Sequence, residues 1–198
     1  KSMIRFIRRW YFSQIATWAL VFKQRDIAFD YYAKIIAERP DDTLTLSRVA
    51  FLHAEAGDHA AAVRGFERVV SIRPDDADGW FNLGYLHQQY GDHGDAITAF
   101  ERATTIKPGH DLSWYGQGLS LVALKRDEDA IKPFKENISL QPMSPHGFME
   151  LARVYFRLGD SERCEKQMRR LKAFDPKNAA ALEDETGIRI GVERWWKT

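Results

Sequence analysis

The sequence is poor in the features that define several classes of protein. Its 198 residues contain a single cysteine, Cys164, which excludes an internal disulfide framework and a zinc site built from several cysteines. Lys and Arg total 29 against 28 Asp and Glu, so the net charge of +1 does not suggest a nucleic-acid-binding protein. No stretch of the sequence combines the length and the lack of charge that a bilayer-spanning helix needs. The composition, 44% hydrophobic and 29% charged, is that of an ordinary folded chain.

Proline is also scarce, but its placement is regular. Five of the seven prolines are separated by one constant interval: Pro40, Pro74, Pro108, Pro142 and Pro176. The flanking sequence repeats with them, as ERPDD, IRPDD, IKPGH, LQPMS and FDPKN. A fixed period of this length indicates stacked supersecondary units.

Each unit is predicted to be a pair of helices. In residues 77–110, Asp76 is suited to cap the first helix, and apolar or small residues follow at helical spacing. Gly91 and Asp92 break the helix, a second apolar stripe runs to Ala103, and Pro108 ends the unit. We expect Pro133 to lie in the first turn of its helix, where a proline removes few backbone hydrogen bonds.

At these residues the chain resembles the tetratricopeptide repeat family. The residues that carry the resemblance, unit by unit, are Phe12, Ile15, Ala16, Ala19, Ala28, Tyr32 and Pro40; Leu46, Val49, Ala50, Ala62, Phe66 and Pro74; Trp80, Leu83, Gly84, Ala96, Phe100, Ala103 and Pro108; Trp114, Gly118, Ala130, Phe134 and Pro142; Phe148, Leu151, Ala152, Tyr155 and Pro176. The small residues among them, with Cys164 in the fifth unit, are expected where two helices approach closely. A larger side chain there costs about 1–3 kcal/mol.

The resemblance implies an all-α, right-handed superhelical solenoid of about five helical hairpins plus a C-terminal capping helix. The expected divisions are a basic N-terminal segment (1–8), five repeats over 9–178 (9–42, 43–76, 77–110, 111–144 and 145–178), and a capping helix with a Trp-containing tail (179–198). We expect the capping helix to cover 178–190. The tail, with Trp195 and Trp196, suits either a membrane interface or packing back on the last helices.

Motifs for catalysis and for cofactor binding are missing. The sequence has no phosphate-binding glycine loop, no Gly-x-Ser-x-Gly turn and no His-Glu-x-x-His motif. His53 and His87 lie one repeat apart, as do His59 and His93, so the repeat explains their spacing and packing between helices is the preferred interpretation. We expect no enzyme activity, no catalytic residue, no cofactor and no metal.

The resemblance also implies a concave groove that holds a peptide, lined by the first helix of each unit. The groove positions by family spacing are Arg48, Phe51, Phe81, Asn82, Tyr85, Gln89, Tyr115, Leu119, Met149, Arg153 and Phe156. Packing of these aromatic residues within the stack is the alternative interpretation. The lysines of relatives that grip a terminal carboxylate are absent, so a mostly apolar ligand segment is expected.

The first helix has more apolar residues than a repeat requires. Ten of the thirteen residues from Trp10 to Phe22 are apolar or aromatic, and Trp10, Trp18 and Phe22 fall outside the inward stripe. A helix that is apolar on nearly all sides is normally buried on nearly all sides, so other groups should cover these residues. The cover is a partner protein or a second copy of the chain, a membrane surface beside Arg5, Arg8 and Arg9, or the chain's own first nine residues.

The predicted function is a non-catalytic adaptor or scaffold, a subunit or assembly factor of a larger complex. It binds a protein or peptide partner through the groove, through the apolar first helix, or through both. The alternative is a peripheral membrane protein anchored by residues 3–22. We expect it in the cytoplasm or at the inner face of a membrane, with no nucleic-acid partner.

Overall fold

The computed structural model describes residues 2–197, and within this range all the regular secondary structure is helical. Lys1 and Thr198, the outer ends of the two predicted terminal segments, lie outside this range. The helices are α1 (Ser2–Val21), α2 (Arg25–Glu38), α3 (Thr43–Glu55), α4 (His59–Ile72), α5 (Ala77–Tyr90), α6 (His93–Ile106), α7 (Asp111–Ala123), α8 (Asp127–Leu140), α9 (Pro145–Arg157), α10 (Ser161–Lys172) and α11 (Pro176–Thr186), followed by a short 3-10 helix (Trp195–Lys197). The all-helical fold of stacked hairpins is confirmed.

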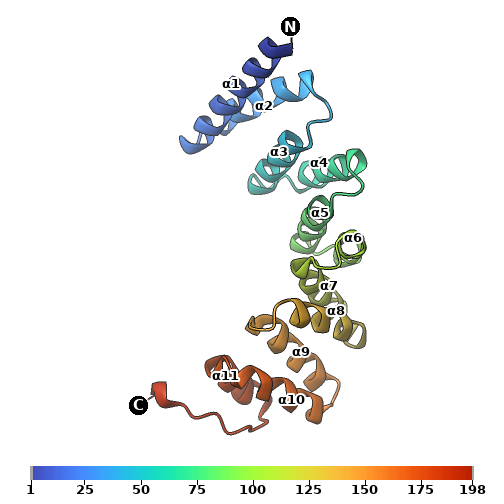
Figure 1. The fold of residues 1–198 in the computed structure, drawn as a ribbon, viewed down its shortest axis with the longest axis vertical. Coiled ribbons are helices and arrows are strands. Elements are labelled where there is room, and N and C mark those ends of the chain that lie inside the picture. The colour runs from blue at the N-terminus through green and yellow to red at the C-terminus, as the bar shows by residue number, and fades with distance from the viewer. Residues whose placement is uncertain (1, 198) are drawn as a thin grey trace. The chain divides into compact units, whose positions relative to one another are not determined.

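The chain forms two compact units, residues 1–86 and 87–198, with the boundary inside α5. In the first unit α1 packs on α2, α2 on α3, and α3 on α4 (Figure 1). In the second unit each helix from α6 to α10 packs on the helix that follows it, and α11 also contacts α9. Contacts therefore join neighbours along the chain, as expected for a repeat architecture.

Columns of residues at equivalent repeat positions form the cores of the units. Ala28, Ala62, Ala96, Ala130 and Cys164 are fully buried on the second helices. One turn further along lie the large buried side chains of Tyr32, Phe66, Phe100, Phe134 and Met168. A Cβ on Gly118 of α7 would lie 2.6 Å from the ring of Phe134 in α8, so a larger residue than glycine does not fit there without movement. Small residues thus allow the two helices of a hairpin to approach closely.

The turn inside each hairpin uses a residue with positive φ. Gly57, Gly91 and Gly159 have φ of 79°, 87° and 74°, as glycine allows without strain. The equivalent positions in the first and fourth hairpins are Lys23 and Lys125, with φ of 59° and 61°. The residue type does not indicate these two, because lysine has no preference for the left-handed conformation, but both stand one repeat length from a turn glycine.

Three boundaries differ from expectation. Regular helix begins at Ser2, so residues 2–8 extend the first repeat helix and do not form a separate segment. Those residues therefore cannot fold back over α1, which removes that predicted cover. Pro133 is the seventh residue of α8, because the helix begins at Asp127, before the expected start near Asp129. The carbonyl of Asp129 consequently receives no bond from residue 133.

The third boundary is the end of the chain. Helix α11 stops at Thr186, where Gly187 takes a left-handed conformation, four residues short of the predicted helix end. The segment that follows folds back onto the last helices and buries Ile190 and Val192. Glu183 anchors it, because its Oε1 accepts hydrogen bonds from the backbone N–H of Ile190 (2.7 Å) and of Val192 (3.2 Å). Of the two terminal tryptophans, Trp196 packs against this core and Trp195 is exposed.

Candidate protein-binding surfaces

A pocket of about 320 Å³ opens in the first unit between α1, α2 and α3. It is lined by Thr17, Leu20, Tyr32, Arg48, Phe51, Leu52 and Glu55. Two of these, Arg48 and Phe51, were predicted groove residues, and α3 brings them to the same wall. The ring of Phe51 meets the buried ring of Phe66 edge-on at 4.9 Å but stays 41% exposed. The sequence did not predict that α1 supplies the opposite wall.

The pocket has apolar walls with charged groups among its lining residues. Arg48 Nη1 donates a hydrogen bond of 3.3 Å to Ser13 Oγ, a neutral partner that leaves the positive charge uncompensated by that contact. Glu55 is paired with Arg25 at 3.4 Å, but both side chains are about half exposed, so water weakens this pair. A ligand with an apolar side chain and flanking polar groups matches this lining.

Predicted groove residues of α5 lie on one stretch of helix in the first unit. The rings of Phe81 and Tyr85 are 6.3 Å apart, and Tyr85 is exposed. Asn82 lies beside them and is half-buried. Gln89, one turn further on, belongs to the second unit and is exposed.

In the second unit several predicted groove residues are used in packing. Tyr115, Leu119 and Met149 lie against the buried cluster that includes Phe134. The ring of Tyr115 meets Phe134 edge-on at 5.9 Å and His146 at 6.2 Å. Burial, and then the negative charge of Glu150, raise the pKa of the Tyr115 hydroxyl. These side chains stabilise the contact between hairpins. Phe156 of α9, at 42% exposed, is the most accessible member of the predicted set here.

Two arginines of α9, the predicted groove residue Arg153 and its neighbour Arg157, are paired within the fold. Arg153 donates hydrogen bonds to Glu185 of α11 (2.9 Å) and to Glu150 of its own helix (2.6 Å). The bond to Glu185 is the main reason that the pKa of Arg153 is raised. Arg157 likewise lies 2.6 Å from Asp127. Both guanidinium groups tie α9 to neighbouring elements.

The first helix exposes the aromatic residues predicted to need cover. Trp10, Trp18 and Phe22 are each more than half exposed, and the rings of Trp18 and Phe22 stack at 6.2 Å. The inward stripe of α1 includes Ala16 and Ala19, both buried.

The repeated histidines pack at equivalent places. The ring of His53 lies 4.8 Å from Phe29, and its Nδ1 is 3.5 Å from Asp58. His87 Nδ1 is 3.7 Å from Asp92, which occupies the position of Asp58 in the next repeat. Over residues 2–197, no cluster of three or more His, Cys, Asp or Glu side chains is arranged to hold a metal ion. In the same range no helix has both the length and the hydropathy needed to cross a membrane.

Comparison with known proteins agrees with these hairpins. Residues 52–111 and 91–145 match the family model described as tetratricopeptide repeat. A crystal structure of MamA aligns over 92% of this chain and 97% of its own, with a TM-score of 0.76 and 16% identity. MamA from residue 41 onward of Desulfovibrio magneticus RS-1 aligns over 85% of this chain and 97% of its own, with a TM-score of 0.72 and 19% identity. The chain is a tetratricopeptide repeat protein.

The MamA structures share the fold of this tetratricopeptide repeat protein, and identities this low show no more than the fold. No curated protein matches its sequence significantly. Any binding function of this chain is therefore inferred from its own surfaces.

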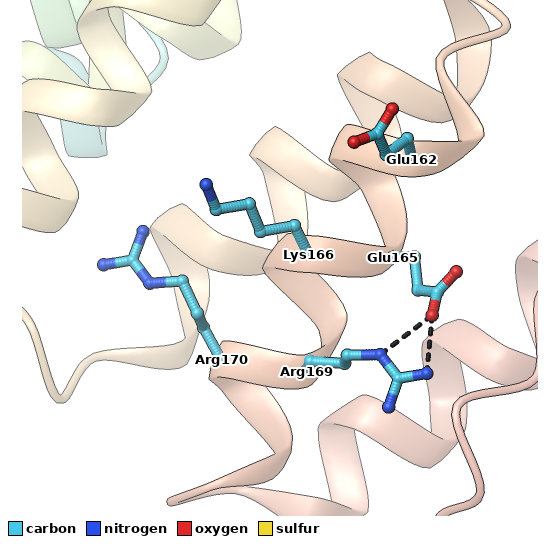
Figure 2. Close-up of a pocket in the computed structure, with 5 residues that line it drawn as sticks. All are labelled: Glu162, Glu165, Lys166, Arg169 and Arg170. Atoms are coloured by element: carbon cyan, nitrogen blue, oxygen red, sulfur yellow. Dashed lines mark hydrogen bonds and ion pairs between the residues drawn. The ribbon is translucent and has the colours of Figure 1, made fainter.

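One surface of this tetratricopeptide repeat protein was not predicted. Figure 2 shows Lys166 and Arg170 one turn apart on α10, beside a surface depression of about 420 Å³. On the same helix Arg169 is held by Glu165, with its Nε 2.8 Å from Oε1 (Figure 2). The guanidinium of Arg170 also lies 4.8 Å from the centre of the Phe148 ring. The spacing of basic residues in SERCEKQMRRLK was the available signal, but exposed i, i+4 charges are common on any surface helix.

Proposed function

We propose that this chain is a non-catalytic adaptor that captures an apolar segment of a partner protein in the pocket between α1, α2 and α3. The tetratricopeptide repeat fold supports a role in protein interaction. The observation that carries the specific site is the pocket of about 320 Å³, in which Leu20, Tyr32 and Leu52 supply apolar wall beside the partly exposed Phe51. A concave, mostly apolar surface with a few polar groups is the usual form of a recognition site.

Predicted groove residues of α5 offer a second contact region within the first unit. Tyr85 offers an accessible aromatic ring and Asn82 an amide on the same stretch of helix. Aromatic residues in such positions are frequent sources of binding energy. The groove residues of α7 and α9 remain a prediction, and the packing of Tyr115 makes it a poor choice for a binding test, because its removal disturbs the core.

The experiment is a selection of binding peptides from a random library displayed on phage, with the intact chain as target. Peptides that bind the wild type are then titrated against two pocket variants, Phe51→Ser and Thr17→Trp. The first removes the aromatic wall, and the second fills the pocket without removing any buried apolar side chain. We expect each to weaken binding at least tenfold.

Leu44→Ser is the matched control, because Leu44 is an exposed apolar residue on the same helix as Phe51 but outside the pocket lining. Circular dichroism checks that all three variants stay helical. Peptides that bind both pocket variants as tightly as the wild type, or a selection that yields no binder, would count against the proposal.

A further inference from the structure

Helix α1 carries a second apolar face that nothing in the described chain covers. Its members are between 54% and 74% exposed: Met3, Ile4, Phe6, Ile7, Trp10, Tyr11, Trp18 and Val21, with Phe22 directly after the helix. Because an α-helix turns about 100° per residue, Met3, Ile7, Trp10 and Trp18 fall on the side opposite to the buried Ala16 and Ala19. A cluster of this size on a surface indicates a binding site.

The start of α1 also extends beyond its partner helix. α1 has 20 residues and α2 has 14. Arg8 lies 2.6 Å from Glu38, the last residue of α2, so residues 3–7 continue past the point where α2 ends. Every side chain in this extension is exposed. The outer face and the extension together form one accessible surface, which we call the outer face of α1.

The charge along the first helix has one sign. Residues 1–25 contain six lysines and arginines and no aspartate or glutamate, although the whole chain is almost neutral. Of the basic side chains, Arg8 is compensated by Glu38 and Arg9 is half-buried, while Arg5 and Lys23 are exposed at the two ends of the helix. Arg5 falls on the side of Ala16, but in the extension that lies past the end of α2. A surface that is both apolar and positive is complementary to lipids with anionic headgroups.

We propose that the outer face of α1 binds the surface of a membrane that contains anionic lipids. The helix lies in the plane of the interface, with Trp10, Tyr11 and Trp18 at headgroup depth, where amphipathic rings are favoured. Since α2 packs on the opposite side of α1, the rest of the first unit stays in water. This surface is separate from the peptide pocket, so the inference goes beyond the proposed function.

The test is co-sedimentation of the intact chain with vesicles. One set is phosphatidylcholine alone, and the other contains roughly a third phosphatidylserine. We expect binding to the anionic vesicles, weakened as salt rises above about 0.1 M. The variant Ile7→Gln/Trp10→Gln/Trp18→Gln should lose at least tenfold in partitioning. Replacing Arg5 and Lys23 by Gln should cost about fivefold for each charge removed.

The matched control is Leu44→Gln/Leu112→Gln/Met143→Gln, which removes three exposed apolar residues outside α1 and should bind vesicles like the wild type. Peptide binding by the outer-face variant should be unchanged, which keeps this test independent of the pocket. Absence of binding to either vesicle, or equal binding to both, overturns the proposal. So does self-association of the wild type that disappears in the outer-face variant without vesicle binding, because a second copy then covers the face.

Discussion

Gly118→Ala tests how closely the two helices of a hairpin approach. The new Cβ would lie 2.6, 2.7 and 2.9 Å from three ring carbons of Phe134. That ring is fully buried, so it cannot move toward solvent without opening the core. Overpacking of this kind costs about 1–3 kcal/mol, against which alanine gains up to about 1 kcal/mol of helix propensity over glycine.

Gly94→Ala is the control, because a Cβ at Gly94 of α6 meets nothing within 4 Å. Both glycines belong to the second unit, so the same unfolding transition is compared. We expect the unfolding free energy of Gly118→Ala to be about 1–3 kcal/mol below that of Gly94→Ala, measured by urea titration with circular dichroism at 222 nm.

A double-mutant cycle assigns the effect to the ring. Phe134→Leu removes the ring carbons nearest to the new Cβ, so Gly118→Ala should cost at least about 1 kcal/mol less in that background. Equal stability of the two alanine variants, or no coupling between residues 118 and 134, would show that the ring does not limit the approach of the two helices.

Three further predictions follow from local features. Lys125→Gly should raise stability by about 0.5–1 kcal/mol, because relief of the left-handed strain outweighs the added freedom of the unfolded chain; urea unfolding checks it, and a loss of stability would contradict it. The pKa of Glu183 is lowered, because although burial raises it, the hydrogen bonds from Ile190, Val192 and Arg194 outweigh burial. The stabilisation by the Glu183 carboxylate is therefore complete above the ordinary pKa of about 4.3 and is lost as pH falls below that value. The difference in unfolding free energy between wild type and Glu183→Gln should shrink from pH 6 to pH 3. A difference that stays constant over this range would be evidence against the anchoring role of Glu183. Burial, and then the charge of Asp160, raise the pKa of the Cys164 thiol to about 11, so a disulfide reagent at pH 8 should react only after urea unfolding, and rapid labelling of the native chain would show that the thiol is accessible.

The regular part of the fold was predictable, because the same packing problem recurs in every repeat. Ala62 and Phe66 are fully buried at the positions that Ala96 and Phe100 occupy in the next repeat, so each repeat strengthens the inference from the others. Histidines at the same interval were explained in the same way. Periodic burial of this kind depends on local spacing, which is visible in a sequence.

Departures from the repeat were not predictable. The left-handed conformation of Lys125 is not one of them, because residue 125 lies one repeat length from the turn glycines Gly91 and Gly159, although its residue type gives no such signal. The end of α11 depends on Gly187 and on the carboxylate of Glu183, which binds backbone groups seven and nine residues away. Such contacts are set by tertiary structure and not by spacing.

The candidate site was predictable only in part, for the same reason. Family spacing placed Arg48 and Phe51 on a first helix, and both line the pocket. The same rule placed Tyr115 and Arg153 in the groove, yet the ring packs on Phe134 and the guanidinium binds Glu185. Whether a first-helix residue meets a ligand or a neighbouring hairpin depends on how closely that hairpin approaches.

The sharpest test of the proposed function is to map a selected peptide on the intact chain by amide chemical shifts in NMR. We expect the changes to concentrate on both walls of the pocket, around Thr17 and Leu20 of α1 and Phe51 to Glu55 of α3. Changes confined to α10, or none in the first unit at saturating peptide, would contradict capture in this pocket.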